Sequence, residues 1–254
     1  MSAMSHPLFA RFYQRISEVM DRAGAAEHRK ALTAGLRGRV IEIGAGNGRM
    51  FAHYPPQVTE VLAVEPEPHL RAAALDAAQT APVPIKVIDG LAEDLPAGDG
   101  EFDAAVAALV LCTVPDQATA LTEIRRVLRP GGQLRFFEHI AAPDPGLLHR
   151  TQRLVDATVW PRLFAGCHTS RDTVTAITAA GFVIDEVHRF PFPDSGPPTP
   201  ARPHARGRAT RVPHGQADIA EAILEPREAR QRGRDSVHRR RTRPDHGRTG
   251  TPAP

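Results

Sequence analysis

Short apolar runs recur along the first 140 residues and alternate with segments of helical spacing. The runs cover Arg39–Ile43, Glu60–Val64, Pro84–Ile88, Phe102–Leu109 and Gln133–His139. Uninterrupted apolar runs of this length are typical of strands that are buried on both faces of a parallel sheet. The alternation therefore predicts an α/β fold with a doubly wound sheet, whose ligand crevice lies at the carboxyl ends of the central strands.

Helical segments are predicted before, between and after these strands. They are Pro7–Gly24, a helix that begins at Arg49–Tyr54 and is stopped by Pro55-Pro56, Pro68–Gln79, Gln117–Val127, Gly146–Trp160 and Ser170–Ala180. Two more strands are expected at Gly181–Phe190 and within Arg202–Arg211. From Val212 the composition is too poor in apolar residues to offset the entropy of ordering, which predicts a disordered basic tail with one short helix at Ala217–Leu224.

A glycine cluster follows the first predicted strand directly. Gly44, Gly46 and Gly48 are spaced so that Arg49 stands where a dinucleotide motif has its third glycine, and no Lys-Ser/Thr pair completes a phosphate loop. The turn, with Ala45 inside it, therefore lets the backbone approach a ligand without cradling a diphosphate. An NAD-dependent oxidoreductase stays as a weaker alternative.

Two acidic residues flank the glycine cluster. Glu65, followed by Pro66, lies about 20 positions beyond Gly44 at the end of the second strand, where a carboxylate can accept hydrogen bonds from ribose hydroxyls. Glu42 precedes the glycines, where a carboxylate can hold an ammonium group directly or through water. A nucleoside without a pyrophosphate, joined to an amino-acid moiety, describes S-adenosylmethionine.

Five stretches resemble the successive motifs of class I S-adenosylmethionine-dependent methyltransferases with a type 11 domain. They are EIGAGNG, AVEPE, GLAEDLP, EFDAAVAALVLCTVPD and EIRRVLRPGGQLRFFEH, in the family's order over about Arg39 to His139. The resemblance implies a Rossmann-like, seven-stranded, mostly parallel sheet with helices on both faces. HYPPQV, LVLCTV, FFEHIAA, WPRLFAGCHTSRDT and RPHARGRA carry a closer resemblance to the methyltransferase-like group that includes alkyl thiol methyltransferases.

The resemblance also implies which residues contact the cofactor. The motif glycines pass under its methionine part, and the acid at the end of the second strand binds its ribose. The backbone around Ala92 and Glu93 faces the adenine, while Ala108 and Leu109 line the sulfonium region. Leu91 stands where many relatives carry an Asp that binds the adenine amino group. Together with the flanking residues, the expected cofactor contacts are Glu42, Gly44, Ala45, Gly46, Gly48, Glu65, Pro66, Ala92, Glu93, Ala108 and Leu109.

The chemistry of methyl transfer asks for few catalytic groups. The sulfonium is an activated donor, so the enzyme mainly aligns the reactants, and a base is needed only if the acceptor arrives protonated. A thiol, with a pKa of about 8.5, needs little such help. Glu138 and His139, at the end of the fifth strand, and His168, on a loop, are the candidates for a base or a substrate-orienting group. For each, capping or packing is the competing interpretation.

The remaining composition excludes several partners. Cys112 and Cys167 give neither a disulfide framework nor a paired metal-ligand spacing, so we expect small buried hydrophobes, no metal and a reducing, cytoplasmic compartment. No apolar run reaches the roughly 18 residues of a membrane span, and stable membrane insertion is not expected. The Arg239–Arg243 cluster has no interleaved aromatic residues, which argues against nucleic-acid binding.

These observations predict three regions and one main function. The regions are an N-terminal helical lid over residues 1–36, a methyltransferase domain over residues 37–211 and a disordered tail over residues 212–254. The predicted function is S-adenosylmethionine-dependent methyl transfer to a small molecule, with a thiol suggested by resemblance. An O- or N-methyltransferase of a metabolite or lipid headgroup is the alternative within the class. A non-catalytic S-adenosylmethionine-binding regulatory module is the alternative outside it. The oligomeric state is left open.

Overall fold

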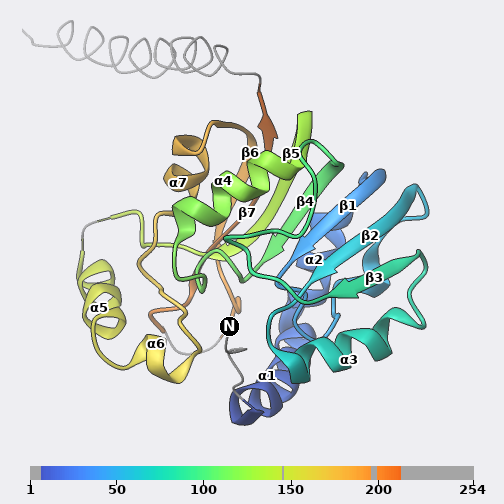
Figure 1. Cartoon of the computed structure of the whole chain (residues 1–254). Helices are drawn as coiled ribbons and strands as arrows, with labels where there is room; N and C mark the ends of the chain where they lie inside the picture. Colours follow the sequence, from blue (N-terminus) through green and yellow to red (C-terminus); the bar gives the residue numbers. More distant parts are fainter. Residues whose placement is uncertain (1–6, 145, 196–198, 213–254) are drawn as a thin grey trace, which may run out of the picture. The chain divides into compact units, whose positions relative to one another are not determined.

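A single mixed sheet organises the domain (Figure 1). The computed structural model describes residues 7–144, 146–195 and 199–212. Within them the strands are β1 (Gly38–Ile43), β2 (Val58–Val64), β3 (Ile85–Ile88), β4 (Phe102–Ala108), β5 (Leu128–His139), β6 (Phe182–Pro191) and β7 (Pro203–Arg211). They form a seven-stranded sheet in the order β3-β2-β1-β4-β5-β7-β6. Pairing is parallel except that β7 runs antiparallel to both neighbours, which confirms the predicted mostly parallel sheet.

Helices and short helical turns connect the strands. They are α1 (Pro7–Met20), the π-helical turn Asp21–Ala25, α2 (Ala26–Thr33), the 3-10 turn Phe51–His53, α3 (Pro68–Ala78), α4 (Gln117–Val127), α5 (Leu147–Asp156), α6 (Trp160–Leu163) and α7 (Thr173–Ala179). Asp116 caps α4 by accepting hydrogen bonds from two backbone N–H groups of its first turn, as its sequence position predicts. In this part of the chain no helix is both long and apolar enough to cross a membrane.

Two apolar layers hold the helices against the sheet. Side chains alternate along a strand, so Ile41 and Ile43 of β1 face one layer while Val40 faces the other. The first layer includes Ile124 of α4, and the second includes Leu32 of α2; both side chains are buried. Burying one such side chain contributes about 1.5–3 kcal/mol. Helices therefore cover both faces, as predicted.

Three local predictions were wrong. Helix α2 was not predicted, because AEHRKALT contains few apolar residues with helical spacing. The helix expected to begin at Arg49 is only the turn Phe51–His53, which ends directly before Pro55-Pro56. The fifth strand was predicted to begin at Gln133, whereas β5 begins at Leu128 and includes Arg129–Gly132, where the pairing with β4 shifts register as in a β-bulge. The predicted tail and its short helix at Ala217–Leu224 lie outside the described residues.

Candidate functional site

The strand register brings the ends of β1, β2 and β4 to one edge of the sheet. Ile43, the last residue of β1, is paired with Val64 of β2 and with Ala107 of β4. Gly44 and Glu65 follow these strands directly, so both enter the same edge. On the next strand Ala108 is paired with Phe137, which places Glu138 beside them. The cofactor residues expected after separate strands therefore converge, as the carboxyl ends of parallel strands do.

The glycine loop depends on left-handed backbone conformations. Gly44, Gly46 and Gly48 have φ values of 64°, 58° and 77°. A Cβ atom on Gly44 would lie 2.4 Å from a methyl carbon of Val110, and one on Gly48 would lie 2.8 Å from Cβ of Ala77. Residues with side chains rarely adopt this conformation, and here there is no space for one either. The sequence motif is therefore required by the shape of the turn.

Glu65 fastens this loop to the end of β2. Its Oε2 accepts a hydrogen bond from the backbone N–H of Gly46 at 2.7 Å, and its Oε1 accepts one from Glu67 at 2.9 Å. The residue is 5% exposed. Burial raises the pKa of the carboxyl, although the two backbone hydrogen bonds oppose that rise. A carboxylate has about four acceptor positions, so capacity for ligand hydroxyls remains.

A small cavity lies over the glycine loop. Its volume is about 20 Å³, and its lining residues are Tyr13, Arg29, Glu42, Gly44, Ala45, Asn47, Arg49, Met50 and Ala108. Four of these were predicted cofactor contacts, and they come from two separate segments of the sequence, the stretch Glu42–Ala45 and the end of β4. The ring of Tyr13 covers the loop: a Cβ atom on Gly46 would lie 3.1 Å from its Cε1. A cavity this small holds little more than a water molecule.

Glu42 lies in the wall of this cavity as a buried acid. The hydroxyl of Tyr54 donates a hydrogen bond to its Oε2 at 2.7 Å. Burial raises the pKa of Glu42 to about 8, while the Tyr54 hydrogen bond and the charge of Arg29 oppose the rise. Glu42 is therefore placed where it can face a ligand's ammonium group, whose charge would favour the ionised carboxylate.

Helix α1 and the turn after it are attached to the glycine loop by polar contacts. Asn47 Nδ2 donates to Ser17 Oγ at 3.1 Å, and Arg49 Nη2 donates to Glu18 Oε1 at 2.9 Å. Arg49 also lies 3.6 Å from Asp21, which forms an ion pair with the buried Arg29. The N-terminal segment therefore covers the loop in the manner of a lid.

The end of β4 turns through a strained residue. Leu109 has a φ of 61°, which is rare for a residue with a side chain, and its N–H donates to the carbonyl of Phe137 at 2.7 Å. The backbone N–H groups of Val110, Leu111 and Cys112 then donate to the carboxylate of Glu138 at 3.0, 3.0 and 3.2 Å. Three fixed donors hold the turn in place and compensate for the strain at its start.

The carboxylate of Glu138 is therefore occupied by hydrogen bonds to the backbone. The residue is fully buried, and burial raises the pKa of its carboxyl against the three backbone hydrogen bonds. Both oxygens accept protein N–H groups. This geometry favours a positioning role for Glu138 over direct contact with a substrate. Of the two interpretations of Glu138 from the sequence, it favours capping over catalysis as a base.

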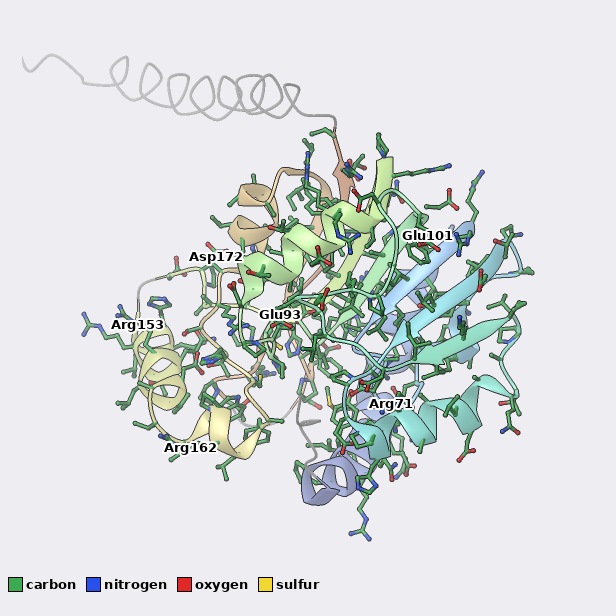
Figure 2. All side chains as sticks on the ribbon, viewed as in Figure 1. Arg71, Glu93, Glu101, Arg153, Arg162 and Asp172 are labelled. Carbon is green, nitrogen blue, oxygen red and sulfur yellow. The ribbon has the colours of Figure 1, made fainter. Side chains whose placement is uncertain are left out.

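The residues expected near the adenine differ in exposure and in their polar contacts. Ala92 is buried, whereas Leu91 is 47% exposed. Glu93 accepts a hydrogen bond from the backbone N–H of Asp116 at 3.2 Å, which links the segment after β3 to the start of α4 (Figure 2). The carbonyl of Pro66 accepts a hydrogen bond from Nη1 of Arg71 at 2.9 Å. Glu93 and Pro66 therefore both hold this edge of the site together.

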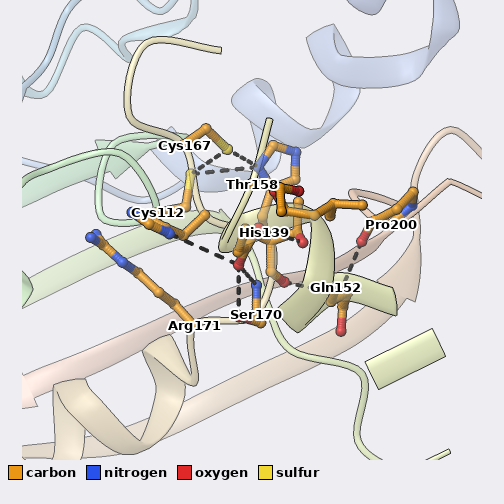
Figure 3. Close-up of polar contacts among 12 residues, drawn as sticks. Cys112, His139, Gln152, Thr158, Cys167, Ser170, Arg171 and Pro200 are labelled. Carbon is orange, nitrogen blue, oxygen red and sulfur yellow. Dashed lines mark hydrogen bonds and ion pairs between the residues drawn. The ribbon is translucent and has the colours of Figure 1, made fainter. Parts of the chain in front are cut away.

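His139 faces both cysteines (Figure 3). Its Nδ1 lies 3.5 Å from Sγ of Cys112 and 3.3 Å from Sγ of Cys167, and the two sulfur atoms are 3.9 Å apart. Both cysteines are buried and free. They are small buried residues as predicted, and they also lie beside each other, which their sequence spacing does not indicate. They lie 55 positions apart in the sequence, and the fold brings them together.

The three groups influence each other's ionisation. Cys112 and His139 lower the pKa of Cys167 to about 4 despite burial. Burial opposes the charged form of His139, but Cys167, Glu138 and Asp156 outweigh it and raise the pKa of the imidazole. The thiol of Cys112 is correspondingly harder to ionise, and its pKa is raised well above the usual value.

His168 does not join this group. Its backbone N–H donates to the carbonyl of Cys112 at 2.7 Å, while its ring lies 4.0 Å from the Asp156 carboxylate. Arg29 and Asn47 line the cavity but were not predicted, and neither was Tyr54, which donates a hydrogen bond to Glu42. For Tyr54 a signal existed in its place just before Pro55-Pro56, where the chain must leave the helical turn. For Arg29 there was none, because α2 itself was missed.

The arrangement fits a nucleoside with an amino-acid group. The glycine loop leaves a cradle that any Cβ atom would fill, and Glu65 at the neighbouring strand end offers hydroxyl acceptors. Glu42 and Arg29 line the same cavity, one as a buried acid and the other as a buried cation. Arg29 and Arg49 also line the cavity, but both are ion-paired with Asp21, and the glycine spacing departs from a dinucleotide motif.

Comparisons with known proteins agree with this arrangement. Residues 41–136 match the methyltransferase domain family. Thiol S-methyltransferase TMT1B from Homo sapiens is 34% identical over 187 residues, covering 72% of this chain and 75% of that protein. Thiol S-methyltransferase TMT1A from Homo sapiens is 30% identical over 213 residues, covering 80% and 86%. The crystal structure of the YcgJ protein from Bacillus subtilis has a TM-score of 0.57 at 19% identity, covering 74% of this chain and 99% of that one.

Proposed function

This chain belongs to the S-adenosylmethionine-dependent methyltransferases, and from that premise we propose that its methyl acceptor is a small thiol. The cofactor of the enzyme is S-adenosylmethionine, which supplies the methyl group from an activated sulfonium. The observation that carries the acceptor proposal is the engagement of Glu138. The best-placed carboxylate at the carboxyl edge of the sheet already accepts three backbone N–H groups.

The residues that would hold the cofactor are those that converge at the sheet edge. The loop from Gly44 to Gly48 would carry the methionine part, and Glu65 would accept hydrogen bonds from the ribose hydroxyls. Glu42 would face the ammonium group. Helix α1, which holds Tyr13 over Gly46, would exclude water from the reacting groups. Fixing the reactants in line in this way can lower a barrier by about 7–11 kcal/mol.

A thiol acceptor suits a site with few available bases. An alcohol or an ammonium acceptor must lose a proton that is held tightly near neutral pH, whereas a thiol has a pKa of about 8.5. Glu138 is occupied, and Glu42 is tied to Tyr54 at 2.7 Å. The ring of His168 lies outside the cavity wall. A nucleophile that ionises with little help is therefore the acceptor that this site can serve most readily.

The relatives support the same acceptor class. Both human proteins that align with more than two thirds of this chain are named thiol S-methyltransferases. These two relatives are 34% and 30% identical to this chain, and their shared name describes their own acceptor. Together with the geometry of the site, it supports a thiol acceptor here.

The test is release of S-adenosylhomocysteine by the purified full chain with S-adenosylmethionine and matched sets of small thiols, alcohols and amines. We expect release with thiols, rising as pH approaches the thiol's own pKa. Glu65→Gln should lower release through weakened cofactor binding, while Glu27→Gln, an exposed change of the same type, should leave it unchanged.

Two results would contradict the proposal. Faster release with an alcohol or an amine than with any thiol would reassign the acceptor to oxygen or nitrogen. Confirmed cofactor binding without release for any acceptor class, together with loss of cellular function on deleting residues 212–254, would favour a non-catalytic binding module. Because cofactor binding is measured separately by calorimetry, a misfolded preparation is distinguished from both results.

A further inference from the structure

The group Cys112, His139 and Cys167 has no role in the function described above. Cys112 lies in the turn after β4, His139 ends β5, and Cys167 lies in the loop between α6 and α7. Three segments thus deliver two sulfur atoms and one imidazole nitrogen to one place (Figure 3). We propose that these three side chains bind one divalent metal ion of the zinc class, with the fourth position left to an exogenous ligand.

The separations of the three atoms match tetrahedral coordination. Zinc bonds of about 2.3 Å to sulfur and about 2.0–2.1 Å to nitrogen, at tetrahedral angles, separate two sulfurs by about 3.8 Å and sulfur from nitrogen by about 3.5 Å. The observed separations are 3.9 Å between the sulfurs, and 3.5 and 3.3 Å between the sulfurs and Nδ1 of His139. An ion can therefore enter without rearrangement of the backbone.

The charge balance also suits a buried site. Two thiolates and a neutral imidazole carry a charge of −2, which a divalent cation neutralises. Without an ion, two thiolates in this buried place would face a large desolvation penalty. On binding, two protons pass to solvent, one from Cys112 and one held by the Cys167–His139 pair, and the imidazole keeps its proton on Nε2 while Nδ1 coordinates. No oxidant or reductant is required, in contrast to a disulfide.

The described residues offer three ligand atoms at this place. Three protein ligands with one open position is the pattern of catalytic zinc, including a two-cysteine, one-histidine set. Cys112 lies in the turn that follows Ala108, a residue of the cavity wall over the glycine loop. An acceptor thiol bound as a thiolate at the open position would therefore lie near the cofactor edge; this last point rests on the proposed function.

The first experiment is metal analysis of the full chain purified from zinc-supplemented cells without chelators. We expect close to one zinc ion per chain. Chelator-treated protein titrated with Co²⁺ should develop tetrahedral visible bands and a thiolate-to-cobalt charge-transfer band. Cys112→Ser and Cys167→Ser should each weaken the charge-transfer band by about half or more and lose stoichiometric zinc, because each removes one of two thiolates. His168→Asn, next to Cys167 but outside the group, should keep both signals.

Several outcomes would overturn the inference. The first is folded wild-type protein that contains only trace metal and shows no cobalt bands. The second is a metal content of the cysteine variants equal to that of the wild type. The third is a disulfide between Cys112 and Cys167 in the freshly purified chain. Cofactor affinity measured in parallel shows whether each variant is folded. A small alkyl monothiol should shift the cobalt spectrum, and an unchanged spectrum would overturn the open position. Because metal content needs no acceptor, failure here is separate from failure of the thiol assignment.

Discussion

The backbone N–H of Gly46 donates a 2.7 Å hydrogen bond to the carboxylate of Glu65, across two adjacent parallel strands. The loop after β1 and the end of β2 are thereby held in one arrangement before any ligand arrives. Glu65 has two roles, because the carboxylate that holds the loop also offers further acceptor positions to a ribose. Preorganisation of this kind reduces the entropy lost on binding.

Glu65→Gln should weaken cofactor binding at least about tenfold, which corresponds to about 1.4 kcal/mol. The glutamine retains one oxygen, so one of the two backbone N–H groups now held by Glu65 must face an amide NH₂. Isothermal titration calorimetry with S-adenosylhomocysteine measures the loss. Glu60→Gln, on the same strand but half exposed, is the control. Equal affinities for the two variants would contradict the assigned role.

Gly46→Ala should lower cofactor affinity more than it lowers stability. The left-handed φ of 58° disfavours a side chain by about 1–2 kcal/mol, and the new Cβ would press on Tyr13 at 3.1 Å. Gly146→Ala adds a methyl group where nothing lies within 4 Å, and it should change neither quantity. Chemical denaturation and calorimetry on both variants check the comparison. Unchanged affinity in Gly46→Ala would show that the loop does not contact the ligand.

Glu42 should make stability depend on pH in a defined window. Its folded pKa is about 8, above the ordinary value of 4.5, so the folded state holds a proton that the unfolded state releases between these values. Stability contributed by the neutral acid is present below pH 4.5 and is lost as pH rises towards 8, with a limiting slope of about 1.4 kcal/mol per unit. Tyr54, Arg29 and Glu65 are the titratable groups that face it.

Glu42→Gln should remove this dependence while keeping an oxygen for the Tyr54 hydroxyl. Measured by urea denaturation, the variant should gain stability relative to wild type as pH rises from 5 to 8. A constant difference across that range would mean that Glu42 is ionised in the folded protein throughout.

Glu138→Gln should destabilise the enzyme by about 1–3 kcal/mol, because at least one of three buried backbone donors loses its acceptor. Activity should fall through displacement of the turn after β4, with KM and kcat both affected. Chemical denaturation and steady-state kinetics on the same variant distinguish this structural effect from a direct effect on the chemical step. Glu27→Gln is again the exposed control. Full stability with a collapsed kcat alone would instead restore Glu138 as a base.

The strands of the parallel region could be predicted because burial on both faces leaves a direct mark on the sequence. Glu60–Val64 and Pro84–Ile88 were placed within about two residues of β2 and β3 by continuous apolar runs alone. Helix α2 left no comparable mark. Its Leu32 is buried while Glu27 and Lys30 are exposed, and eight residues are too few for a periodic pattern to emerge.

The convergence at this edge could be predicted for the same topological reason, since Gly44 and Glu65 each follow a parallel strand and Ala108 ends one. The convergence of Cys112 with Cys167 could not. Their sulfur atoms meet because the loop after α6 folds back over the turn after β4, and sequence spacing carries no information about that approach. The lid contacts were likewise hidden, because Ser17 and Asn47 carry no pattern that pairs them.

The attachment of α1 to the glycine loop has a consequence for cofactor exchange. Tyr13 lies on Gly46, and Ser17 and Glu18 hold Asn47 and Arg49, so we expect these contacts to slow the departure of spent cofactor along this face. Each turnover would then include detachment and return of the helix. We expect release of S-adenosylhomocysteine to limit the turnover rate. The product should then inhibit the enzyme because it leaves slowly, and the acceptor should bind after the donor.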